Sequence, residues 1–448
     1  MKEFSTKFQK SILFLIKIVM YGLSLVTFFV MFSFDNPEII DLSRTAAVTL
    51  STYVIMLLLL SNIYGGYEIG AKRRREIVIS LTLTGIITDL VTYLELTIMK
   101  TNEANNATFK IENVGVLVAV FVIQFIIFIL FTILGNNFYF WINEAEKCLI
   151  ITTGDEGAKK VALAMSLFKS KYKINEIVDV ADNNLEEKML LADTIVMYDV
   201  PVQKRTEIID FAYRNLKNIY FNPRIADILE QASKTSIVDD VPFFTWNFHV
   251  LTFEQRIIKR LMDIVISLFV LILTSPIFLV SAVLIKRHDG GSVFFKQKRA
   301  TVNGKVFEIY KFRTMRENVE NKSTFVGDDR ITPIGKTLRK YRIDELPQLL
   351  NIIKGDMSLV GPRPEMLENV DEYTKALPEF IYRLRMKAGL TGYAQIIGKY
   401  NTSSRDKLML DLMYIENYSI LKDIQLLFRT VLVIFKAEDS TAAFDGAE

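Results

Sequence analysis

The sequence predicts a membrane protein of the α plus α/β class: a four-helix transmembrane bundle, a Rossmann-like cytoplasmic domain and a C-terminal module with a re-entrant helix. Three observations lead to this prediction. Half of the 448 residues are apolar although 23% are charged, which is unusual for a soluble protein. Many of the apolar residues form long runs, four of them near the start of the chain. After these runs, short β-rich segments alternate with polar helical segments, which is typical of a parallel sheet.

Four apolar runs account for the predicted transmembrane helices in residues 1–140. They are Ser11–Phe34, Thr45–Tyr64, Ile77–Met99 and Val114–Leu134. Each approaches or exceeds the roughly 20 residues of a spanning helix. The third run contains Asp89 and Glu95, and such acids usually face the interior of a bundle. Because lysines precede the first run and KRRR fills the loop at 72–75, the positive-inside rule predicts a cytoplasmic N-terminus and a cytoplasmic chain after Leu134.

Residues 141–246 are predicted to form the Rossmann-like cytoplasmic domain. The first strand is expected within CLIITTGDEG (148–157), followed by a helix over Ala158–Lys169. Further strands are expected at Ile174–Val180, Thr194–Tyr198, Asn218–Phe221 and Ser236–Val238. The glycine turn at 153–157 is not a clean GxGxxG, and its two acids would repel a phosphate. A regulatory or oligomerising domain is therefore favoured over a nucleotide site, which stays the alternative.

A fifth apolar run, Leu261–Ile285, is long enough to cross a bilayer but has features that favour a re-entrant helix over 256–287. Basic pairs stand on both sides of it, so the charge rule gives it no direction. Ser275 and Pro276 lie past its middle, where proline removes a backbone donor and breaks the helix. The freed backbone groups need partners such as the Ser275 hydroxyl. A fifth full span is the alternative.

The stretch from Tyr341 to Pro364 gathers the residues that suit phosphoryl transfer. Two adjacent acids, Asp344 and Glu345, lie between an arginine-rich run and a Pro/Gly-rich turn with Arg363. One acid can attack phosphorus or hold a divalent ion while the cations neutralise phosphate charge. The single cysteine excludes a disulfide framework and a Cys-based zinc site, so carboxylates must carry such chemistry. The alternative is a solvated helix start, where acids are also favourable.

Residues 247–436 resemble the bacterial sugar transferases, that is, polyprenyl-phosphate hexose-1-phosphate transferases with a monotopic phosphoglycosyl transferase module. The matching blocks are KRLMD (259–263), the Ser275-Pro276 break, VFFKQKR (293–299), GKVFEIYKFRTMR (304–316), DELPQLLNIIKGDMSLVGPRPE (344–365), GLTGYAQI (389–396) and DLMYIENYS (411–419). The whole chain looks like the long form that starts capsule or exopolysaccharide synthesis. Two departures stand out. Tyr341 and Arg342 replace a small polar pair, and AGLTGY (388–393) replaces PGITGW, which leaves the sugar open.

The resemblance implies transfer of a hexose 1-phosphate, glucose or galactose, from a UDP-sugar to undecaprenyl phosphate with release of UMP. By this resemblance Asp344 is the nucleophile of a covalent phosphosugar intermediate, and Glu345 supports it. Both would hold Mg²⁺, which prefers one or two carboxylates plus substrate phosphates. The cations expected to bind phosphates are Lys311, Arg313 and Arg363, with Arg339 on the lipid phosphate. A catalytically silent, membrane-anchored nucleotide-sensing scaffold of a polysaccharide assembly complex is the alternative.

The expected setting is the bacterial cytoplasmic membrane, with the catalytic module on its inner face. Cations at Lys259, Lys286, Arg287 and Lys298 are expected on anionic headgroups. Residues 414–435 form either an interfacial helix or a packing helix, and residues 437–448 a flexible tail. Expected partners are membrane lipids, a second copy in a homodimer and other polysaccharide assembly proteins, but no nucleic acid.

Overall fold

The computed structural model describes residues 2–103, 111–246, 251–316, 328–398 and 403–435, so the predicted tail at 437–448 lies outside the described residues. It divides into two compact units, residues 1–222 and 223–448. Within the described ranges, five helices are long and apolar enough to cross a membrane, namely α1, α2, α3, α4 and α9. The predicted combination of apolar membrane helices with an α/β part is therefore confirmed at this level.

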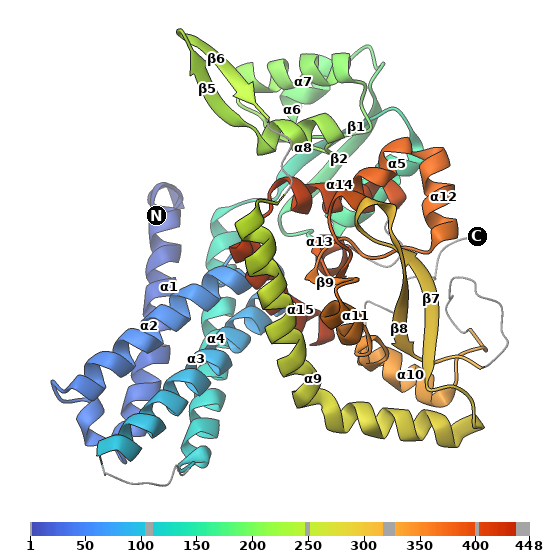
Figure 1. Ribbon diagram of the computed structural model, residues 1–448. Helices are drawn as coiled ribbons and strands as arrows, with labels where there is room; N and C mark the ends of the chain where they lie inside the picture. The colour runs from blue at the N-terminus through green and yellow to red at the C-terminus, as the bar shows by residue number, and fades with distance from the viewer. Residues whose placement is uncertain (1, 104–110, 247–250, 317–327, 399–402, 436–448) are drawn as a thin grey trace. The chain divides into compact units, whose positions relative to one another are not determined.

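The first unit begins with four long helices that pack against one another (Figure 1): α1 Lys2–Ser33, α2 Arg44–Tyr64, α3 Arg74–Glu103 and α4 Val114–Ile142. Aromatic rings such as Phe28, Phe32 and Tyr53 fill the space between them. Many large apolar side chains point outward and are exposed, as suits helices surrounded by lipid. Asp89 is fully buried and accepts a hydrogen bond from Gln124 Nε2 at 3.1 Å, so this acid faces the bundle interior as predicted.

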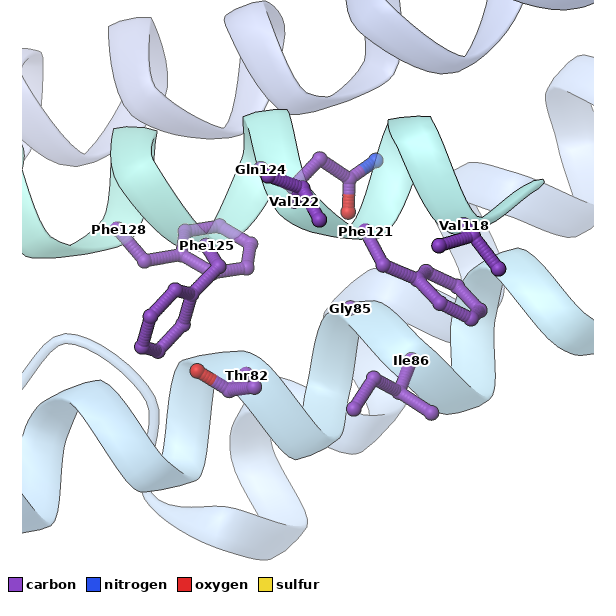
Figure 2. A pocket seen from close by; sticks show the side chains of 9 residues that line it. All are labelled: Thr82, Gly85, Ile86, Val118, Phe121, Val122, Gln124, Phe125 and Phe128. Carbon is purple, nitrogen blue, oxygen red and sulfur yellow. The ribbon is translucent and has the colours of Figure 1, made fainter. Parts of the chain in front are cut away.

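A cavity of about 240 Å³ lies between α3 and α4. Figure 2 shows its lining, which is mostly apolar, with Thr82 and Gln124 as the polar members. Gly85 on α3 is needed here because a Cβ at this position would lie 2.9 Å from the Phe128 ring of α4. The Gln124 amide also donates to Ser24 O and to the Tyr53 hydroxyl, and so links α4 with α1 and α2.

The first unit ends in a parallel four-stranded sheet of order β2-β1-β3-β4. Its strands are β1 Glu146–Thr152, β2 Tyr172–Asp179, β3 Thr194–Tyr198 and β4 Asn218–Phe221, alternating with α5 Asp155–Ser166, α6 Leu185–Leu191 and α7 Val202–Arg214. The β-branched and sulfur-containing residues of β1 and β3 are buried because helices cover the sheet. Four of the five predicted strands therefore form one sheet.

The fifth predicted strand pairs elsewhere. Residues 236–238 belong to β5 Lys234–Val238, which follows α8 Ile225–Ala232 and forms an antiparallel hairpin with β6 Val241–Thr245 in the second unit. Asp239 and Asp240 both have positive φ, 48° and 67°, which is the conformation of a two-residue hairpin turn. The acidic pair reverses the chain at once, so this strand does not extend the parallel sheet.

The second unit contains α9, Phe253–Asp289, which bends visibly along its length in Figure 1. Pro276 lies inside it and has no N–H to give to the carbonyl of Ile272. The Ser275 hydroxyl donates to this carbonyl instead, at 2.7 Å. A Thr252 capping box begins the helix, and Gly290 ends it at a φ of 75°.

The remaining elements form a compact α/β arrangement. In chain order they are β7 Phe294–Ala300, η2 Val302–Gly304, β8 Val306–Phe312, α10 Pro333–Lys340, η3 Ile343–Glu345, α11 Gln348–Lys354, β9 Ser358–Val360, α12 Leu367–Ala376, η4 Pro378–Arg385, β10 Gly389–Thr391, α13 Tyr393–Ile397, α14 Ser404–Glu416 and α15 Ile420–Phe435. Two short sheets occur, antiparallel β7-β8 and parallel β9-β10. The predicted helix over 414–435 is divided between α14 and α15. Asp423 and Leu426 of α15 are buried, which favours the packing alternative.

Candidate active site

The two neighbouring acids lie in a single turn of 3-10 helix between two short helices. Arg342 follows α10 with a φ of +56°, an uncommon conformation for a residue with a side chain. This left-handed residue ends α10 and turns the chain into η3, which holds Asp344 and Glu345, before α11 begins at Gln348. Both acids are partly buried. The position is therefore a tight turn and not the solvated start of a long helix.

Glu345 is held by two cations from different parts of the chain. Its Oε1 accepts from Lys311 Nζ of β8 at 3.1 Å and from an Arg363 guanidinium nitrogen at 3.0 Å. Arg363 belongs to the Pro/Gly turn that follows β9. Two of the four predicted phosphate-binding cations, Lys311 and Arg363, are thus brought to the acid pair.

Asp344 stands beside this ion-paired group, and no described residue forms an ion pair with it. Within the described ranges, no group donates a hydrogen bond to its carboxylate. Burial, and next the negative charge of Glu345, raise the pKa of Asp344 to about 6, although Lys311, Arg339 and Arg363 act in the opposite direction. The ionised form of the Asp344 carboxylate is therefore less stabilised than that of Glu345, which favours its reactivity as a nucleophile.

Glu345 titrates in the opposite sense. Burial alone would raise its pKa, but the cations of Lys311, Arg363 and Arg342 outweigh burial and hold the pKa of Glu345 well below its usual range. Its negative charge in turn raises the pKa of the Arg363 guanidinium. Two adjacent carboxyl groups thus have pKa values pushed apart, which is how neighbouring acids acquire different roles.

The other two predicted cations have different surroundings. Arg339 of α10 donates from Nε to the Thr314 hydroxyl at 2.9 Å, and it acts electrostatically on Asp344. The structure does not bring Arg313 into the contacts of the acid pair. Its guanidinium is buried and makes two hydrogen bonds to Asp289 at the end of α9. The phosphate-binding role predicted for Arg313 therefore stays a prediction without a contact to the acids.

The expectation that Lys259 meets lipid headgroups is wrong. Its side chain is buried, 6% exposed, and its Nζ lies 2.5 Å from Asp423 Oδ2. It also donates to Val360 O at 3.0 Å. The prediction came from the position of this basic pair directly before an apolar run. In the structure, α15 and β9 pack around Lys259 and bury it. By contrast, Lys286, Arg287 and Lys298 are not buried.

Asn351 fixes the helix after the acids against the strand that carries Lys311. Its Oδ1 accepts from Tyr310 N at 2.9 Å, and its Nδ2 donates to Glu308 O at 2.7 Å. The side chain is fully buried, so both backbone groups depend on it. This arrangement sets β8 beside α11 and holds Lys311 near Glu345.

A second group of residues supports Arg363. Arg383 is buried, pairs with Asp411 at 2.7 Å and donates to Arg363 O at 2.9 Å. Glu365 lies beside Arg383 and Lys407, at 3.7 and 3.4 Å. Sequence reasoning did not single out Arg383 or Lys407. Asp411 was visible only as part of a matching block, because nothing in a single sequence pairs it with a residue 28 positions earlier.

The acid pair fits Mg²⁺ only in combination with a substrate. The described part of the chain contains no cluster of three or more His, Cys, Asp or Glu side chains that could hold a metal. One oxygen of Glu345 already accepts from two cations, which leaves its other oxygen and the Asp344 carboxylate as ligands. Since Mg²⁺ normally completes its shell with water and substrate phosphates, two carboxylates are sufficient.

The comparisons with known proteins concern the part of the chain that holds this site. The family described as bacterial sugar transferase matches residues 254–437. An uncharacterised sugar transferase of Bacillus subtilis (strain 168) is 42% identical over 183 residues, 41% of this chain and 89% of that protein.

Two further relatives carry names that state a reaction. A UDP-N-acetylgalactosamine-undecaprenyl-phosphate N-acetylgalactosaminephosphotransferase of Aeromonas hydrophila is 42% identical, over 40% of this chain and 43% of that protein. A UDP-glucose:undecaprenyl-phosphate glucose-1-phosphate transferase of Caulobacter vibrioides is 38% identical, over 39% of this chain and 68% of that protein. The match thus spans less than half of the Aeromonas protein, but most of the Bacillus and Caulobacter proteins.

Proposed function

Because this chain belongs to the bacterial sugar transferase family, we propose that it transfers a sugar 1-phosphate from a UDP-hexose to undecaprenyl phosphate and releases UMP, as the first membrane step of capsule, exopolysaccharide or O-antigen synthesis. The observation that carries the proposal is the contrast within the acid pair. Glu345 is fixed by Lys311 and Arg363, whereas Asp344 beside it forms no hydrogen bond or ion pair with the described part of the chain. That arrangement suits a nucleophile next to an anion-binding support.

In the first step, a carboxylate oxygen of Asp344 attacks the phosphorus that bears the sugar. A new bond forms between this oxygen and phosphorus, and the bond to the bridging oxygen of the diphosphate breaks, so UMP leaves with the electron pair. Lys311 and Arg363, which contact Glu345, would offset the negative charge that gathers on the phosphate oxygens in this step. Mg²⁺ held by Asp344 and Glu345 would add Lewis-acid stabilisation of the same charge.

In the second step, a phosphate oxygen of undecaprenyl phosphate attacks the same phosphorus. The bond from phosphorus to Asp344 breaks, which regenerates the carboxylate and leaves the sugar joined to the lipid by a diphosphate. Arg339 is suited to hold the acceptor phosphate because its guanidinium lies near Asp344 and offers several donors. Two displacements at one phosphorus divide one difficult reaction into two.

The membrane part matches the location of both substrates. The acceptor phosphate lies at the headgroup plane, and the donor is dissolved in the cytoplasm. In this proposal α1 to α4 cross the membrane, and α9 enters and leaves it on the cytoplasmic face. The proline bend supports this, as do exposed apolar side chains on both sides of the bend, such as Phe269 and Leu279.

A nucleotide-sensing scaffold is the second candidate, and the parallel sheet is where its ligand would bind. In doubly wound sheets the nucleotide lies at the carboxyl ends of the strands, where the strand order reverses. Here Tyr198 at the end of β3 packs against Gly157 in α5, and a Cβ at Gly157 would lie 2.4 Å from the tyrosine ring. The ring occupies space near the helix start, which favours a structural role for this domain.

The proposed function is tested by supplying membranes that contain the protein with Mg²⁺, undecaprenyl phosphate and a panel of UDP-sugars: glucose, galactose and N-acetylgalactosamine. Release of UMP, dependent on the lipid acceptor, is expected with at least one sugar. Asp344→Asn should abolish it, whereas Asp371→Asn, at an exposed position of α12, should not. Release of UDP in place of UMP would contradict the proposal.

A further inference from the structure

We propose that three charged residues at the start of α9, Lys259, Arg260 and Asp263, position Arg363 against Glu345. We call these three residues the α9 clamp. The inference rests on the proposed function, because it concerns the geometry of the same site. It gives α9 a second role besides anchoring. The first turns of α9 hold the two chain segments that meet at the acid pair, which are β9 and α11.

Asp263 holds the strand that leads to Arg363. Its Oδ1 accepts from Leu359 N at 2.8 Å and from the Ser358 hydroxyl at 3.0 Å. Asp263 is 2% exposed, so these two donors replace the water that the carboxylate loses. The first two residues of β9 are thereby fixed to the helix.

Lys259, one turn earlier on α9, holds the end of the same strand. Its Nζ donates to Val360 O at 3.0 Å and forms an ion pair with Asp423 of α15 at 2.5 Å. The Tyr414 hydroxyl donates to Asp423 Oδ1 at 2.6 Å, which completes a buried network. A buried ion pair of this kind loses its compensation when one partner is removed.

Arg260 holds the other segment, the helix that follows the acids. Its guanidinium donates to Ile352 O and to Ile353 O, both at 2.6 Å. These carbonyls belong to the last turn of α11, where Ile352 O also accepts from Gly355 N at 3.0 Å. Since α11 begins three residues after Glu345, Arg260 fixes the element to which the acids are attached.

The connection from the clamp to Arg363 is short and stiff. Only Gly361 and Pro362 separate Val360 from Arg363. Proline fixes its own φ, and a Cβ on Gly361 would lie 2.2 Å from Lys387 O, so this glycine is enclosed by backbone. A displacement of β9 relative to α11 is therefore transmitted to the 3.0 Å contact between Arg363 and Glu345.

The test uses Asp263→Ala, which removes the acceptor, and Asp263→Asn, which keeps an oxygen there. Arg256→Ala is the matched control, because Arg256 lies exposed on the same helix. We expect Asp263→Ala to lower kcat/KM for UMP release by about 10- to 100-fold, as positional errors at active sites do. Asp263→Asn should restore most of the activity, and Arg256→Ala should leave it unchanged.

A double-mutant cycle separates positioning from a general loss of folded protein. In an Arg363→Ala background, Asp263→Ala should have little further effect on kcat/KM, since coupled residues are not additive. Fully additive losses would overturn the proposal.

A readout without activity separates this inference from the proposed function. Wild-type protein that releases no UMP would contradict the proposed function alone. The α9 clamp is then tested by backbone hydrogen exchange, which does not depend on activity. Faster exchange across residues 358–363 in Asp263→Ala, with no change in Arg256→Ala, supports the clamp. Unchanged exchange in that segment overturns it.

Discussion

At the scale of single residues, Asp344 and Glu345 are adjacent in sequence but differ in their surroundings. Glu345 shares one oxygen between two cations, and Asp344 has a raised pKa. The difference arises because residues distant in sequence, Lys311 and Arg363, are both brought to Glu345. A division of roles between the two acids therefore follows from tertiary structure, and it has measurable consequences.

The first consequence is a pH dependence. Asp344 attacks only when ionised, so kcat/KM is expected to fall as pH drops through about 6. Glu345→Gln removes the neighbouring negative charge that raises the pKa of Asp344. The acidic limb of the pH–rate profile, measured on the activity that this variant retains, should therefore move to lower pH. Glu368→Gln, at an exposed position of α12, should leave the limb in place. A limb that does not respond to Glu345→Gln would show that another group titrates.

The second consequence concerns stability. The folded-state pKa of Asp344 lies above the ordinary value of 3.8, so the ionised group destabilises the folded protein at neutral pH. Asp344→Asn should therefore raise the free energy of unfolding at pH 8 by about 3 kcal/mol, and the thermal midpoint with it. The gain should shrink as pH falls below about 6, because the wild-type carboxyl then binds a proton. A lower midpoint for the variant at pH 8, measured by thermal unfolding, would contradict this.

Sequence reasoning identified the acids and their flanking cations, because these are short motifs with a chemical meaning. It assigned Lys259 to the membrane surface, which was wrong, and it did not find Arg383. Both errors have one cause. Whether a charged side chain is buried depends on partners such as Asp423 and Asp411, which are more than 25 positions away.

At the scale of elements, glycines allow the turn after β9 to meet the turn around β10. A Cβ on Gly361 would lie 2.2 Å from Lys387 O and 2.9 Å from Gly389 N, both backbone atoms. A Cβ on Gly392 would lie 2.2 Å from Gly361 O. The two turns therefore interlock through backbone contacts, and no side chain fits between them.

Gly361→Ala should accordingly destabilise the protein by about 1 to 3 kcal/mol, the usual range for overpacking, and lower activity with it. Gly154→Ala is the control, because nothing lies within 4 Å of a Cβ added there. Thermal unfolding of both variants checks the prediction. A Gly361→Ala protein as stable as Gly154→Ala would mean that the turns do not interlock in this way.

The strands and helices that sequence patterns predicted best were those formed by continuous apolar runs, such as β3 and α2. The hairpin of β5 and β6 was not foreseen. Its turn depends on two aspartates with positive φ, a signal that is weaker than the usual Asn-Gly or Asp-Gly. The division of residues 414–435 into α14 and α15 was also missed, because no proline marks the end of α14.

At the scale of the whole molecule, the proposal places α1 to α4 across the membrane and both ends of α9 in the cytoplasm. Single cysteines in a Cys148→Ser background test this, because Cys148 is the one native cysteine. Asp41→Cys lies in the loop between α1 and α2, Ala71→Cys between α2 and α3, and His288→Cys at the end of α9, all exposed.

A membrane-impermeant maleimide should label Asp41→Cys in intact cells, and the other two variants only after permeabilisation. The expected result follows from the basic residues at 72–75 and at the end of α9. Labelling of His288→Cys in intact cells would mean that α9 crosses the membrane, and the module after it would then face away from the cytoplasmic donor.

The most direct test of the account supplies the protein with the UDP-sugar it uses, without the lipid acceptor, and measures the mass of its peptides. The account predicts a hexose-phosphate adduct on the peptide that contains Asp344, absent from Asp344→Asn and removed when undecaprenyl phosphate is added. Lipid-dependent UMP release with no adduct at Asp344 would contradict the covalent mechanism.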